Sequence, residues 1–308
     1  MEPSLIAYTV KIALVALVTL PALVLAVLFT LRTPGTGGEP SREWAKYAKV
    51  AFGLYTMHNV LRMTNDGLDT ENFDRPYMSY DPMYLALMAL YSVDIPFEHV
   101  GAAAVFYSLF HLCRAFEILR PGETPTGPRR RHKWALAAFV WVCLASVTAM
   151  CLSISDWAAE VNISYDDYDP EEDVQPMNRG LAGTIIQLAL YATHILCAIF
   201  VLVDIAKTRK KVLGSPLHKA SDVMLTCGIL WLVHVVWLVL SLALPLGVSY
   251  HGDDWPSILV LMLDLLLDSY QAFVILVLLY VLATTDKYAV SQPREEQEQR
   301  AKAPAQAV

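Results

Sequence analysis

Two aspartates, Asp264 and Asp268, lie in the last apolar stretch of the chain, between Ser257 and Tyr280, among Leu, Val, Ile and Phe residues. Together with Gln271 they follow an i, i+4, i+7 spacing, which places all three side chains on one face of a helix. An aspartate at the centre of a membrane helix costs roughly 2.5–3.5 kcal/mol on insertion scales. Two of them therefore predict a polar site inside the protein rather than contact with lipid.

The chemistry that these two carboxylates could perform follows from their mutual repulsion. Two unit charges about 6 Å apart repel by roughly 3 kcal/mol at an effective dielectric constant near 20. We therefore expect one of the two, Asp264 or Asp268, to keep its proton near neutral pH and to act as a catalytic general acid toward an epoxide or an alkene. Neighbouring aromatic rings would stabilise the cation that forms.

Other apolar stretches also carry polar groups at membrane depth, and these faces converge only if the helices enclose one central pocket. Taken singly, a histidine, tyrosine or glutamine in a bundle more often holds two helices together than binds a substrate. Arg62, near the outer boundary, is interpreted as snorkelling toward water. The predicted pocket residues are His58, Asn59, His111, Tyr191, His194, Trp231, His234, Tyr270 and Gln271.

The elements that must position these residues are long apolar segments. Hydrophobic residues make up 56% of the 308 residues and charged residues only 17%, which is typical of a polytopic membrane protein. Seven stretches are long enough, or nearly so, to cross a hydrocarbon core about 30 Å thick. They are residues 5–31, 43–63, 97–119, 134–154, 181–206, 222–246 and 257–283.

We therefore predict an all-α fold, a single domain over residues 1–290 with seven transmembrane helices, followed by a disordered cytosolic tail over 291–308. The apolar segment from Met83 to Val93 is too short to span, so it is predicted to be a re-entrant or surface-lying piece.

Charges in the connections predict the orientation. The connections after the third and fifth stretches are strongly basic, whereas the others are acidic. By the positive-inside rule the basic connections face the cytosol, so the N-terminus lies outside or in the lumen and the C-terminus in the cytosol. Asn162, in an Asn-Ile-Ser tripeptide on the outer side, is a predicted glycosylation site. The membrane is expected to be that of the endoplasmic reticulum or the plasma membrane.

Several classes of chemistry find no support in the sequence. No two histidines are four residues apart and no pair of cysteines forms a CxxC clip, so no metal and no other cofactor is expected. The net charge of −7, without a basic patch, argues against nucleic-acid binding. A retinal protein needs a lysine in its last helix, and the stretch from Ser257 to Tyr280 contains none.

The layout of about 300 residues, seven helices, acidic outer loops and an embedded acid resembles that of the seven-helix membrane terpene cyclases of fungal meroterpenoid pathways. This resemblance implies a lyase or isomerase that cyclises an isoprenoid in secondary-metabolite biosynthesis. The same plan is similar to fungal lipid-translocating exporter-like proteins, which have arginines in helices two and three and a late acid. Here Arg62, Arg114 and either Asp264 or Asp268 take those places, without the family's surrounding glycines and arginines.

A third resemblance is to UbiA-type membrane aromatic prenyltransferases, which hold Mg-diphosphate through two Asp-rich motifs. The segment from Asn65 to Asp69, followed by Asp74, is similar to the first motif, and Asp264 with Asp268 is similar to the second. Asp74 is one residue too far along, and the segment is on the predicted outer side, so a solvated acidic loop is the alternative interpretation.

The sequence thus leaves two functions open. The first is a membrane-embedded enzyme acting on a hydrophobic, isoprenoid or lipid-like substrate, with Asp264 and Asp268 as the catalytic acids. The second is a non-enzymatic seven-helix receptor or lipid-translocating protein, in which the same aspartates bind a ligand or fix helix packing.

Overall fold

The structure, a computed structural model, describes residues 3–33, 40–72, 82–119, 129–162, 174–215, 217–247 and 255–285, all helical or in short turns. The predicted tail over 291–308 lies outside the described residues. The elements are α1 (Pro3–Arg32), the short 3-10 turn η1 (Pro40–Arg42), α2 (Glu43–Asn72), α3 (Pro82–Leu119), α4 (Arg129–Asn162), α5 (Val174–Lys211), α6 (His218–Gly247), α7 (Trp255–Asp264), the π-helical turn η2 (Leu265–Tyr270) and α8 (Gln271–Thr284).

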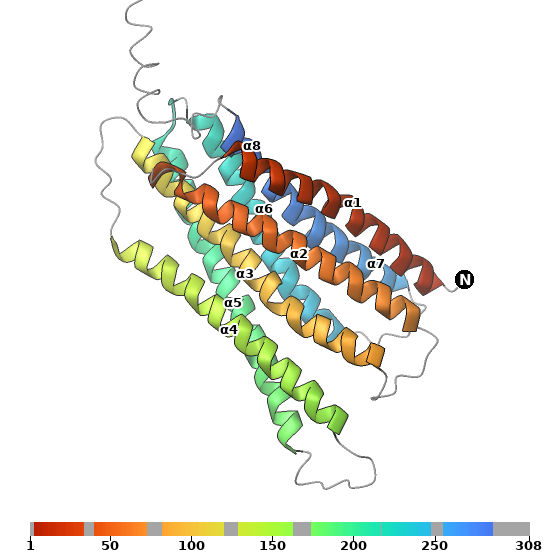
Figure 1. Cartoon of the computed structure of the whole chain (residues 1–308). Coiled ribbons are helices and arrows are strands. Elements are labelled where there is room, and N and C mark those ends of the chain that lie inside the picture. The colour runs from red at the N-terminus through yellow and green to blue at the C-terminus, as the bar shows by residue number, and fades with distance from the viewer. Residues whose placement is uncertain are drawn as a thin grey trace, which may run out of the picture.

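These described elements form one bundle of long helices, in which α7, η2 and α8 make a single continuous rod (Figure 1). We call the end where α1 begins the N-terminal end of the bundle. The end of α2 and the starts of α3 and α7 also lie there, whereas α2 and α4 begin at the opposite end (Figure 1). The bundle is therefore built of helices that alternate in direction.

Six of the described helices are long and apolar enough to cross a membrane, which makes the chain a helical membrane protein by length and composition. The exposed residues of α1 and α4 are large and apolar, for example Leu17, Leu20 and Leu144, as expected for faces that contact lipid. α2 is not among the six. Its second half is too polar, with Arg62, Asn65 and further charged residues.

α3 is the central helix of the bundle. In its most apolar window 83% of the residues are buried, compared with 28% in α1, α4 and α5. It packs most extensively against α2. Small residues on both helices, including Ala48 and Ala104, are fully buried, so the two backbones approach closely, and Trp44 and Phe116 fill the remaining space.

The interpretation of Met83–Val93 as a separate re-entrant segment is wrong. These residues form the first part of α3, which runs without a break through Pro96 for 38 residues. A proline removes only one backbone hydrogen bond, and a helix enclosed by neighbours tolerates that loss. As a result, Asp94 belongs to the interior of a helix rather than to a loop, on the same helix as Glu98.

Candidate functional site

A π-helical turn interrupts the last helix where the two predicted aspartates lie. In η2 the helix widens by one residue per turn, a local change that is often found at functional sites. Side chains from neighbouring helices bond its carbonyls. Tyr55 of α2 donates its hydroxyl to the Ser269 carbonyl at 2.6 Å, and His234 Nδ1 of α6 lies 3.1 Å from the Leu267 carbonyl. The irregular turn is thus held in place from two sides.

Arg62 of α2 bridges the two aspartates. Its Nη1 and Nη2 atoms donate to Asp268 and Asp264 respectively, and Trp237 Nε1 donates to the second oxygen of Asp264 at 3.2 Å. The Arg62 side chain is only 14% exposed, so the interpretation of a snorkelling arginine is wrong. The guanidinium places a full positive charge between the carboxylates, and this offsets the repulsion on which the predicted retained proton depends.

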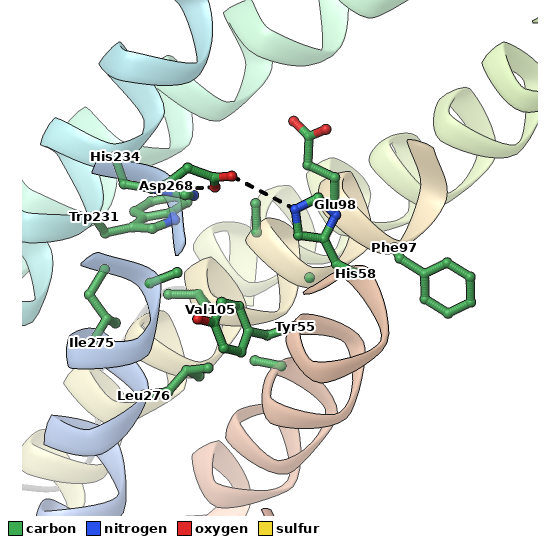
Figure 2. A pocket seen from close by; sticks show the side chains of 14 residues that line it. Tyr55, His58, Phe97, Glu98, Val105, Trp231, His234, Asp268, Ile275 and Leu276 are labelled. Atoms are coloured by element: carbon green, nitrogen blue, oxygen red, sulfur yellow. Dashed lines mark ion pairs between the residues drawn. The ribbon is translucent and has the colours of Figure 1, made fainter. Parts of the chain in front are cut away.

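Two histidines extend this ion-pair network. His58 Nδ1 is 2.9 Å from Asp94 of α3, and its Nε2 is 3.8 Å from Asp268. His234 Nδ1 is 3.8 Å from the other oxygen of Asp268. Figure 2 shows Asp268 reaching from η2 toward His58 and His234, which come from opposite sides. Asp268 is the point at which α2, α6 and η2 meet.

Two cavities adjoin this network. The larger one has a volume of about 600 Å³, and charged residues from α1, α2, α3 and the α7–η2 segment line its wall beside apolar ones. The smaller one, about 40 Å³, is mostly apolar, and Val105, Ile275 and Leu276 lie in its floor (Figure 2). His58, Glu98 and Asp268 line both cavities. Charged groups therefore stand at the junction between a polar and an apolar space.

Sequence reasoning missed Asp94, Glu98 and His99, three residues of α3. Glu98 accepts a hydrogen bond from the Tyr191 hydroxyl at 3.1 Å, and His99 Nδ1 lies 3.3 Å from His194 Nε2 with the two rings stacked. The available signal was the i, i+4 spacing of Asp94 and Glu98. It becomes visible only when the chain from Pro82 to Leu119 is treated as one helix.

The structure brings some of the predicted pocket residues together and separates others. His58, Tyr191, Trp231, His234, Asp264 and Asp268 line one or both cavities. Asn59 is buried beside them and lies 3.4 Å from the Ser269 hydroxyl. The remaining predicted residues make other contacts: His194 stacks on His99, Gln271 donates to the Leu230 carbonyl of α6, Tyr270 donates to the Leu14 carbonyl of α1, and His111 lies at the opposite end of the bundle.

The π turn explains why the Gln271 side chain does not lie on the same helix face as the two aspartates. The i, i+4, i+7 spacing assumes 3.6 residues per turn, and the wider turn between Leu265 and Tyr270 shifts the register of everything after it. Gln271 therefore points toward α6, whereas Asp264 and Asp268 both reach Arg62.

His111 belongs to a second cluster of aromatic and ionisable groups. Its Nδ1 atom is 3.2 Å from Glu43, and the rings of Tyr47, Tyr107 and His132 surround it at centroid distances of 5.1, 4.6 and 5.3 Å. We call this set the ring cluster. It lies near the start of α2 and the end of α3, whereas Asp268 and His58 lie near the middles of their helices.

The structure describes only part of the predicted magnesium-binding and glycosylation motifs. Asp66 pairs with Lys11 at 2.7 Å, while Asp74 and the side chain of Asp69 lie outside the described residues. Within the described part of the chain, no group of three or more His, Cys, Asp or Glu residues is arranged to hold a metal ion. Asn162 is the last residue of α4, and the rest of its tripeptide lies outside the description.

No protein-family model matches this sequence, and neither a curated protein nor a solved structure is significantly similar to it.

Proposed function

We propose that the chain spans the membrane seven times, with α2 as a span in addition to the six apolar helices. Its membrane is that of the endoplasmic reticulum or the plasma membrane, and the N-terminal end of the bundle faces the lumen or the outside. α2 lies beside α1 and α3, and its arginine is paired with carboxylates, so its polar residues need not contact lipid. Basic residues gather where α4 begins and α5 ends, at the opposite end.

We propose further that the protein is a membrane-embedded enzyme that acts on an amphiphilic, isoprenoid or lipid-like substrate by acid–base chemistry. The observation that carries this proposal is the junction of the two cavities at His58, Glu98 and Asp268. The larger cavity has the room for such a substrate, whose functional group would face the carboxylates and imidazoles, and the smaller cavity would take no more than a small apolar group.

The proton route follows from the contacts. Asp94, His58 and Asp268 form a chain in which an imidazole lies between two carboxylates. An imidazole in this position can take a proton on one ring nitrogen and release one from the other, so a protonated His58 could supply the proton to the substrate while Asp268, paired with Arg62, stabilises the imidazolium. A terpene cyclase-type reaction, in which protonation of an epoxide or alkene starts ring closure, is the reaction class that we propose.

A second function is favoured by a specific contact. Because Arg62 bonds both Asp264 and Asp268, the two carboxylates are well suited to fixing α2 against η2 and to binding a ligand without chemistry. A receptor or a lipid-translocating protein would use the same cavity in this way.

The test is a product profile. Yeast that expresses the protein is fed farnesylated phenols or epoxy-isoprenoids, and its extracts are compared with those of cells expressing Asp268→Asn, Asp264→Asn/Asp268→Asn or His58→Gln. We expect a cyclised product that all three variants lose. Asp222→Asn, which changes an exposed aspartate near the start of α6, is the matched control and should keep the product.

Membrane insertion of each variant is checked by fluorescence-detected size-exclusion chromatography. If the correctly inserted wild-type protein yields no new product over the whole panel, the enzyme proposal is rejected in favour of the receptor or translocator.

A further inference from the structure

The larger cavity has an excess of negative charge. Five carboxylates line it, and they face one lysine, one arginine and one histidine. Most of these charges are paired: Lys11 with Asp66, Arg62 with Asp264 and Asp268, and His58 with Asp94. Even with His58 protonated, the wall keeps more negative than positive charge, and this favours a cation in the cavity.

Glu98 is the one carboxylate of this wall that takes part in none of these ion pairs. Its hydrogen bond comes from the neutral hydroxyl of Tyr191, and no cationic side chain of the described residues forms an ion pair with it. It lines both cavities, so its carboxylate stands where the polar and apolar spaces meet (Figure 2). A carboxylate in a region of low dielectric constant is costly unless a positive charge lies near it.

Buried polar groups without partners point independently to a bound molecule. Asn65 lines the larger cavity and is 1% exposed, yet neither its amide oxygen nor its amide nitrogen has a hydrogen-bond partner. Trp231 lines the smaller cavity, is also 1% exposed, and its indole N–H has no partner. Buried groups of this kind are rare in folded proteins, and at a cavity wall they are the groups that a ligand or an ordered water satisfies.

We propose that the ligand of the larger cavity is an amphiphile with a protonated amine head group, held by Glu98 and oriented by Asn65, with its alkyl chain against the apolar residues Met88, Ile95 and Leu238 of the same cavity. An ammonium group has three donors and no acceptor, which suits carboxylate and amide oxygens. The aromatic rings of Tyr191 and Trp157 in the same wall suit a cation as well. This inference rests on the proposed function in one respect, that the cavity takes an amphiphile.

The test compares three eight-carbon probes that differ only in their head groups: octylamine, octanol and octanoate. Their binding to the purified full-length protein in nanodiscs of zwitterionic lipid is measured by isothermal titration calorimetry, with empty nanodiscs subtracted. A charge-assisted hydrogen bond in a partly buried site favours octylamine over octanol by about tenfold or more. Octanoate should bind most weakly.

The decisive variant is Glu98→Gln, which keeps an acceptor for the Tyr191 hydroxyl but removes the charge. We expect it to weaken octylamine binding about tenfold and to leave octanol binding unchanged. Glu117→Gln, on the same helix near its other end, is the matched control and should change neither. Thermal unfolding of both variants verifies that they fold.

Equal affinity of the wild-type protein for octylamine and octanol would overturn the proposal, and so would octylamine binding that Glu98→Gln does not change. Because these measurements need no turnover, they separate this inference from the enzyme proposal. Amine-selective binding without any product would reject the enzyme and keep the cationic ligand.

Discussion

The middle of the bundle and the end where α2 begins each bury histidines beside a carboxylate, but they do so in different ways. Near the middle, His58 and His234 lie beside cavities, and Arg62 supplies a permanent cation to Asp264 and Asp268. At the end where α2 begins, His111 is enclosed by the ring cluster, with Tyr47 stacked on one side and Tyr107 edge-on.

This difference shows what a buried histidine signifies in a membrane bundle. His111 makes its close approaches mainly to aromatic rings, and its neighbour Glu43 remains 34% exposed at the side chain. His58 contacts two carboxylates from different helices and faces open space. The residue type is the same, and the partners and the adjacent volume decide whether the position can do chemistry.

Among the substitutions that we propose, removal of the Arg62 cation should have the largest effect on the Asp264/Asp268 site. Arg62→Met leaves Asp264 and Asp268 facing each other without compensation, and the loss of one partner of a buried ion pair costs about 3 kcal/mol or more of folding free energy. Unfolding in mixed micelles titrated with SDS measures this change. Arg131→Met removes an exposed pair with Asp204 and should cost less than about 1 kcal/mol.

The triple variant Arg62→Met/Asp264→Asn/Asp268→Asn tests the cause. If uncompensated charge is responsible, the triple variant recovers most of the lost stability. If it is as unstable as Arg62→Met alone, packing of the arginine side chain matters and the ion-pair explanation fails.

A matched pair of substitutions compares these two regions directly. His58→Phe leaves a buried Asp94 oxygen without its donor and should destabilise the protein by about 1–3 kcal/mol. His111→Phe keeps a ring of similar size among the ring cluster and should cost less than about 1.5 kcal/mol. The same SDS titration measures both, and equal costs would show that the two histidines have equivalent roles.

The smallest effect is expected at the π turn. Tyr55→Phe removes the hydroxyl that donates to the Ser269 carbonyl and should cost about 1 kcal/mol. Tyr270→Phe removes a longer hydrogen bond of 3.3 Å to the Leu14 carbonyl and should cost less. Hydrogen exchange of the amides in η2, followed by mass spectrometry, should rise in Tyr55→Phe and stay unchanged in Tyr270→Phe.

Much of the helical layout is predictable from the sequence because long apolar runs are forced into helices by the need to satisfy backbone groups in lipid. The predicted stretches at 134–154, 181–206 and 222–246 all fall inside observed helices. The prediction failed over Met83–Val93, which was judged by its own length as too short to span, because this segment continues through Pro96 into one helix. Hydropathy also marks α2 poorly, because its polar half is covered by neighbouring helices rather than by lipid.

The site was only partly predictable. The sequence marks Asp264, Asp268, His58 and His234 as polar groups out of place in an apolar setting, and the structure gathers these four. It could not show that Arg62 joins them, because the choice between snorkelling and pairing depends on where η2 lies relative to α2. Nor could it place Glu98, whose position depends on the continuity of α3.

The length of α3 has a consequence for how a molecule enters the cavity. A helix of 38 residues is about 57 Å long, almost twice the thickness of a hydrocarbon core. Even with a substantial tilt, several of its turns must lie among the lipid head groups or beyond them. Asp94 and Glu98, its 13th and 17th residues, lie deeper, and the larger cavity runs from them past Met88 and Asp66 toward this hydrated layer. A guest that enters along this cavity would keep its polar end beside charged side chains instead of crossing the hydrocarbon.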